Sequence, residues 1–140
     1  MMKKLAWWYT AGFLGIFLIC HTPGLTDAEG RLLGLFRIDP IDDIVHLLSG
    51  LAGAWIAWQA PRSIATYFVV IGVLYNLDAL VGMTMSRGLL DLSLFRQGPG
   101  GADFSLTNWA LNAPHIVLAS LALWIGLARP GEPPAGAPAS

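Results

Sequence analysis

The chain has 140 residues, of which 55% are hydrophobic and only 12% are charged, with a formal net charge of −1. Soluble domains carry about twice that share of charged residues. Together with the mean hydropathy of +0.60, this composition favours an integral membrane protein. A net charge near zero gives no basis for expecting a nucleic-acid partner. The single cysteine, Cys20, excludes an internal disulfide framework.

Charged side chains are sparse in four stretches, at residues 5–20, 40–60, 64–82 and 109–128. Each stretch is close to the roughly 20 apolar residues that cross a bilayer as a helix. We therefore predict an all-α fold, a four-helix transmembrane bundle within residues 1–128. The remaining segment, residues 129–140, is rich in Pro, Gly and Ala, which predicts a disordered C-terminal tail.

The first stretch follows Lys3 and Lys4, and no small-x-small cleavage site precedes His21. This pattern predicts a retained transmembrane helix rather than a signal peptide. The two lysines place the N-terminus in the cytoplasm. An even number of spans then returns the C-terminus to the same side.

The loop after the first helix has two features that predict local structure. Thr26 and Glu29 have the spacing of a capping box, and the apolar run from Arg31 to Phe36 favours a short interfacial helix. Asp39 is a suitable N-cap for the second helix, with Pro40 at its first position.

The second half of the chain repeats the pattern of the first. His46 and His115 are 69 residues apart, and the same offset relates Asp39 to Asn108 and Asp43 to Asn112. The outer segment RGLLDLSLFR echoes the earlier RLLGLFR. We therefore predict two tandem helix-hairpin repeats, each with a short amphipathic segment in its outer loop.

Small residues recur at helical spacing in both histidine-bearing helices. Such stripes let helices pack closely in lipid, against the bundle or against a partner subunit. The predicted packing positions are Ser49, Gly53 and Ala57 in the second helix and Ala119, Ala122 and Gly126 in the fourth. A proline within the fourth helix, Pro114, predicts a kink there.

Polar side chains gather toward the outer ends of the predicted helices. Ionisable groups inside a membrane are costly and are therefore candidates for function. The predicted cluster comprises Asp42, Asp43, His46, Asp78, Asn112 and His115. Three interpretations stay open: hydrogen bonding that only joins the helices, a haem b or transition metal bound by the two histidines, and a proton relay or small-molecule pocket.

Three motifs resemble a known family. The segments LFRIDPIDDIVHLLSG and GVLYNLDALVG, with the second Asn-x-x-His at Asn112, are similar to the bacterial membrane family called domain of unknown function 4383. The resemblance covers roughly residues 10–128 and implies four transmembrane helices in the bacterial inner membrane. It implies no established activity. The family pattern usually has Asn where this chain has Asp39 and Asp43.

The sequence therefore predicts a non-enzymatic accessory or structural subunit of a membrane assembly, without a cofactor. Its expected partners are the lipid bilayer and other membrane subunits or further copies of itself. The alternative is a membrane redox or metal-binding protein with His46 and His115 as ligands.

The predicted topology places both termini in the cytoplasm. Reporter fusions at Ser140 and near Gly98 should therefore report opposite sides of the membrane. Activity of both reporters on one side would contradict four spans.

Overall fold

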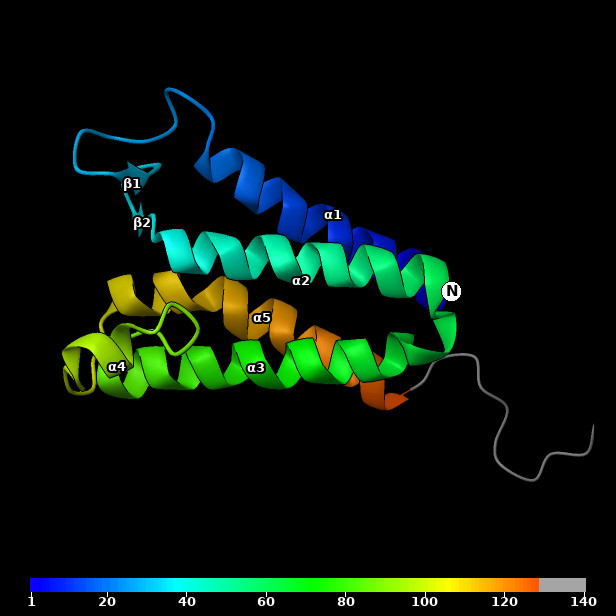
Figure 1. Ribbon diagram of the computed structural model, residues 1–140. Coiled ribbons are helices and arrows are strands. Elements are labelled where there is room, and N and C mark those ends of the chain that lie inside the picture. Colours follow the sequence, from blue (N-terminus) through cyan, green and yellow to red (C-terminus); the bar gives the residue numbers. More distant parts are fainter. Residues whose placement is uncertain (129–140) are drawn as a thin grey trace, which may run out of the picture.

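A computed structural model describes residues 1–128, in which the chain is mostly helical (Figure 1). The predicted disordered tail lies outside the described residues. In chain order the elements are α1 (Met2–Cys20), β1 (Arg31–Leu32), β2 (Phe36–Arg37), α2 (Pro40–Gln59), the 3-10 helix η1 (Pro61–Ser63), α3 (Ile64–Met85), α4 (Ser93–Gln97) and α5 (Leu106–Ala128).

The four long helices are arranged as two pairs. Figure 1 shows α1 beside α2, and α3 beside α5, with the turn at residues 60–63 joining the pairs at one end. Most tertiary contacts lie within the pairs, and far fewer join α2 to α3 or α1 to α3. We refer to the end that holds α4 and the β1–β2 hairpin as the outer end. The N-terminus and the C-terminal end of α5 both lie at the opposite end.

Glycine and alanine determine how closely α3 and α5 approach. A Cβ atom added at Gly72 would lie 2.6 Å from the backbone nitrogen of Leu123, and one at Gly126 would lie 2.8 Å from the carbonyl oxygen of Ala65. Ala119 and Ala122 are buried in the same region. Small residues thus let the two backbones touch, which is how helices gain packing energy where lipid supplies no hydrophobic drive.

The α1–α2 pair also depends on small residues. Ala57 is fully buried, and a Cβ added at Gly53 would lie 2.7 Å from the Thr10 hydroxyl and 2.6 Å from that of Tyr67. The Ser49 hydroxyl lies 3.0 Å from the Tyr75 hydroxyl, across the gap between the pairs. These packing positions therefore face the protein's own helices.

The first outer loop differs from its prediction. Instead of an interfacial helix, β1 pairs antiparallel with β2, and the chain reverses at Leu33 (φ 53°) and Gly34 (φ 71°). The predicted capping box does not form, because one carboxylate oxygen of Asp27 accepts hydrogen bonds from the amides of Glu29 and Arg31. Such an Asx-type turn competes locally with helix formation.

The helix boundaries follow the signals in the sequence. The Asp39 carboxylate accepts a 2.8 Å hydrogen bond from the Ile41 amide and so caps α2. Helix α3 extends to Met85, beyond the predicted end at residue 82. Helix α5 continues through Pro114 and starts at Leu106, three residues before the predicted start. The second outer loop contains the short helix α4.

Two helical segments, Pro61–Met85 and Leu106–Ala128, are long and apolar enough to cross a membrane. Large apolar side chains are also exposed on α1 and α2, including Trp8 and Trp58.

The close approach of α3 and α5 gives a testable expectation. Gly72→Ala should lower the free energy of unfolding by about 1–3 kcal/mol, because the added methyl meets the backbone of Leu123 and forces the helices apart. Gly12→Ala is the matched control on α1, where a Cβ would meet nothing within 4 Å, and it should raise stability by up to about 1 kcal/mol. Thermal unfolding of the purified protein measures both. Equal effects would contradict this packing.

Candidate functional site

A hydrogen-bonded carboxylate joins three segments at the outer end. The His115 ring on α5 donates from Nδ1 to Oδ2 of Asp78 on α3, over 2.9 Å. The other oxygen, Oδ1, accepts from the amides of Leu89 and Leu90 at 2.7 and 2.8 Å. Asp78 is only 6% exposed, so its charge depends on these donors. The loop before α4 is thereby tied to α3 and α5.

The second histidine lies next to the first. Nδ1 of His46 donates to the backbone carbonyl of Asp42, over 2.9 Å, and lies 3.5 Å from the Asp42 carboxylate. The ring centroids of His46 and His115 are 5.9 Å apart. The Tyr75 ring contacts both, with centroid distances of 5.7 and 5.2 Å. The histidines predicted from the repeat thus lie together, with one aromatic ring beside both.

A small polar cavity, which we call the acidic cavity, adjoins His115. Its volume is about 120 Å³. It is lined by Asp42, Asp78, Gly88, Asp91, Leu111, Asn112 and His115. The structure therefore brings α2, α3, α5 and the loop before α4 to one chamber.

Two of the predicted cluster residues have other surroundings. Asn112 lines the acidic cavity, but its amide nitrogen donates to the carbonyl of Asn108, one turn earlier in α5. Asp43 is buried, and its carboxylate lies 3.8 Å from the ring of His21, just beyond α1. Asp43 thus contacts the α1 side of α2 rather than the acidic cavity.

Arg96 on α4 contacts Asp91, one of the residues that line the acidic cavity. A guanidinium nitrogen of Arg96 lies 3.2 Å from the Asp39 carboxylate and donates to the backbone carbonyl of Asp91. Burial alone would raise the pKa of Asp39, but the Ile41 amide and Arg96 hold it below its ordinary value. Arg96 is therefore committed to the N-cap of α2.

Sequence reasoning missed two residues of the site. Tyr75 precedes Asp78 by three residues on α3, a spacing that places both on one helix face, so this signal was present. Asp91 lies in the loop before α4, and no helical periodicity relates it to the histidines. Only the fold of that loop brings Asp91 to the acidic cavity.

The histidine pair does not have the surroundings of a haem or a multiply ligated metal. Within residues 1–128, no group of three or more His, Cys, Asp or Glu side chains is arranged to hold a metal ion. The acidic cavity, at about 120 Å³, is smaller than the roughly 300–1,000 Å³ of typical small-molecule sites. A porphyrin therefore does not fit beside His115 without rearrangement of the helices.

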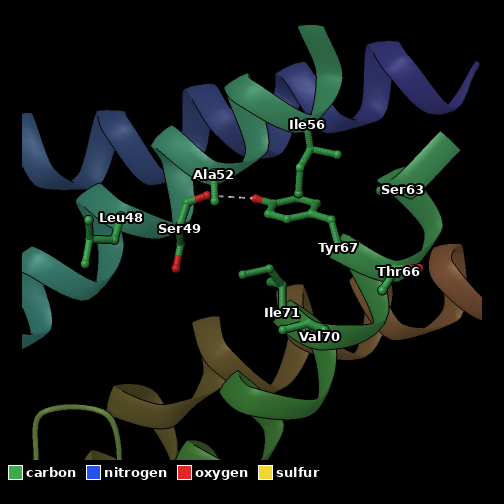
Figure 2. A pocket seen from close by; sticks show the side chains of 9 residues that line it. All are labelled: Leu48, Ser49, Ala52, Ile56, Ser63, Thr66, Tyr67, Val70 and Ile71. Atoms are coloured by element: carbon green, nitrogen blue, oxygen red, sulfur yellow. Dashed lines mark hydrogen bonds between the residues drawn. The ribbon is translucent and has the colours of Figure 1, made fainter. Parts of the chain in front are cut away.

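A larger hollow, the lateral groove, lies between α2 and α3, closer to the turn at residues 60–63 (Figure 2). Its volume is about 370 Å³. The lining is mostly apolar and comprises Leu48, Ser49, Ala52, Ile56, Ser63, Thr66, Tyr67, Val70 and Ile71. Figure 2 shows the Tyr67 ring reaching from α3 toward α2, where its hydroxyl donates to the Ser49 carbonyl.

The comparisons with known proteins identify one family. Its model, described as Domain of unknown function (DUF4383), matches residues 6–128. No curated protein and no solved structure matches the chain.

The Asp78 hydrogen bonds should be measurable. Asp78→Asn should cost about 1.5–3 kcal/mol of stability, because it removes the negative charge that accepts from His115 and two amides. Amide exchange at Leu89 and Leu90 should also accelerate. Asp43→Asn, at similar burial, is the control and should leave that exchange unchanged. Unchanged exchange in Asp78→Asn would show that the carboxylate does not hold the loop.

Proposed function

This chain belongs to the DUF4383 family, and we propose that it is a four-span integral membrane protein that serves as a non-enzymatic accessory or structural subunit of a membrane assembly. In this proposal its two tandem helix hairpins span a bacterial inner membrane, with both termini in the cytoplasm.

One observation carries the structural role: both oxygens of the Asp78 carboxylate are engaged in hydrogen bonds that hold the fold together. A general acid or base needs a free position from which to reach a substrate. Asp78 and His115, which share a 2.9 Å hydrogen bond, instead join α3, α5 and the loop before α4. This arrangement favours a scaffold over a catalyst.

Several features support four spans. Helices α1 and α2 have 19 and 20 residues, close to the roughly 20 that cross a bilayer. Figure 1 shows them alongside α3 and α5, and the N-terminus lies at the same end as the C-terminal end of α5. A cytoplasmic position for that end agrees with Lys3 and Lys4. The lower apolarity of α1 and α2 reflects their charged residues, tryptophans and His46.

A contact with a partner subunit needs a surface that is not already buried between the chain's own helices. The small residues Gly53, Ala57, Ala122 and Gly126 pack against the chain's own helices. The lateral groove is an apolar hollow with exposed margins at Leu48 and Val70. We therefore assign to it an apolar transmembrane helix of another subunit, whose side chains would fill the hollow.

A filled groove should block that contact. In native gels of mildly solubilised membranes, the wild-type chain should migrate well above its monomer mass of 15.0 kDa. Ala52→Trp, within the groove, should shift it to the monomer. Val117→Trp, on the exposed face of α5, is the control and should retain the assembly.

Four results would contradict or change the proposal. If the wild-type chain migrates as a monomer, it does not form an assembly. If the two tryptophan variants migrate alike, the lateral groove is not the contact surface. A Soret band in the absorbance spectrum of the purified protein would instead favour haem binding by His46 and His115. A complex that contains only further copies of this chain would replace the heteromeric partner by a homo-oligomer.

A further inference from the structure

We propose that Thr10 and Tyr67 form a latch between α1 and α3, which is open in this structure and closes when the lateral groove is filled. In the closed latch the Thr10 hydroxyl donates a hydrogen bond to the Tyr67 hydroxyl. The latch rests on the proposed docking of a partner helix only for its trigger, because both hydroxyls and the groove belong to this chain. Occupancy of the groove thereby controls how firmly the two helix pairs are joined.

The Thr10 hydroxyl is buried without a partner. Only 3% of this residue is exposed, and its oxygen is one of two buried side-chain atoms within residues 1–128 that have no hydrogen-bond partner. Two other threonines, Thr22 and Thr84, donate to the carbonyl four residues earlier. Thr10 does not use this common solution. A buried hydroxyl without a partner is costly, so a conformation that supplies an acceptor is favoured.

Tyr67 offers that acceptor nearby. Both hydroxyls lie next to Gly53, where an added Cβ atom would be 2.7 Å from the Thr10 oxygen and 2.6 Å from the Tyr67 oxygen. The Tyr67 hydroxyl donates its proton to the Ser49 carbonyl, over 3.1 Å, and its oxygen can still accept a hydrogen bond. The two hydroxyls thus adjoin one point without being hydrogen-bonded. Closure adds one bond and breaks none.

Tyr67 also connects this point to the lateral groove. Its side chain is part of the groove lining, whereas Thr10 is not. The ring reaches from α3 toward α2 (Figure 2), so an occupant of the groove packs against it directly. Such an occupant presses the ring from the groove side, and beside Gly53 no Cβ atom stands in its way. Movement of the ring in this direction brings the Tyr67 oxygen to Thr10.

The latch acts where the fold has few other connections. Contacts between α1 and α3 are sparse compared with those inside each helix pair. The rings of Tyr9 and Phe68 meet edge to face across this interface, with centroids 5.0 Å apart. The Tyr9 hydroxyl, however, donates to the Leu118 carbonyl of α5. A bond from Thr10 to Tyr67 therefore adds a directional link between α1 and α3 to an apolar contact.

A double-mutant cycle on the monomer tests the latch. The full-length chain is purified in detergent without partner subunits, and thermal unfolding gives Tm. In the wild-type background the latch is open, so Thr10→Val should keep or raise Tm, because it removes a buried hydroxyl that has no partner. In an Ala52→Trp background the indole fills the groove and the latch closes. There Thr10→Val should lower Tm by several degrees.

Thr10→Ser is the matched control for this cycle. It keeps the hydroxyl and removes only the methyl group, so its effect on Tm should be the same in both backgrounds. If Ala52→Trp does not fold, Ala52→Leu fills part of the groove and takes its place. An equal effect of Thr10→Val in the two backgrounds would overturn the latch. An equal loss of Tm would show that the hydroxyl already has a partner, such as a bound water.

Native gels relate the latch to assembly. If a partner helix closes the latch, Thr10→Val should lower the ratio of assembled to monomeric chain about 2- to 10-fold, as for the loss of one hydrogen bond. Thr10→Ser should assemble like the wild type, and an unchanged ratio in Thr10→Val would refute closure by the partner helix. A wild-type chain that forms no assembly removes the partner helix but leaves the cycle intact. An assembly without coupling in the cycle removes the latch and leaves the docking.

Discussion

The hydrogen bonds of Asp78 are the constraint on which the outer half of the structure depends. A carboxylate this deeply buried is stable in its charged form only if donors replace the water it has lost. His115 supplies one donor from α5, and the amides of Leu89 and Leu90 supply two from the loop before α4. The fold of that loop, the rotation of α5 and the orientation of the His115 ring are therefore linked through one side chain.

Close helix packing complements this polar link along the rest of the chain. At Gly72 and Gly126, α5 lies against the backbone of α3, so the helices cannot rotate without collision. Such contacts fix the depth at which His115 meets Asp78. The α2–α3 contact is looser and depends on tyrosine hydroxyls, those of Tyr67 and Tyr75, which reach Ser49 across the gap. Apolar packing thus orders each pair, and polar contacts connect the pairs.

The sequence predicts the long helices well, because their signals are local. Asp39 and Pro40 mark the start of α2, and Pro61 marks its end. The offset between His46 and His115 also predicted two histidines at one depth, and their rings lie 5.9 Å apart. Equal depth follows from a repeat, whereas the direction of each ring depends on the rotation of its helix.

The loops could not be predicted in the same way, since their conformations depend on single polar contacts. Asp27 accepts from the amides of Glu29 and Arg31, and the segment from Arg31 to Phe36 then forms a hairpin despite its amphipathic pattern. Asp91 reaches the acidic cavity through the path of a loop that has no periodicity. The family match extends the resemblance seen in the sequence to residues 6–128, but it adds no chemistry.

The distribution of contacts between the two helix pairs has a mechanical consequence. The pairs are joined covalently by the turn at residues 60–63, and near the outer end they meet through His46, Tyr75 and His115. Between these two joints lies the lateral groove, an incompletely filled space that the Tyr67 ring crosses to reach the Ser49 carbonyl. The two helix pairs are therefore held together at both ends, and their separation is least constrained in the middle. In the membrane setting proposed above, lateral pressure from the lipid would compress this middle section first, and the width of the groove would change while both ends stay fixed.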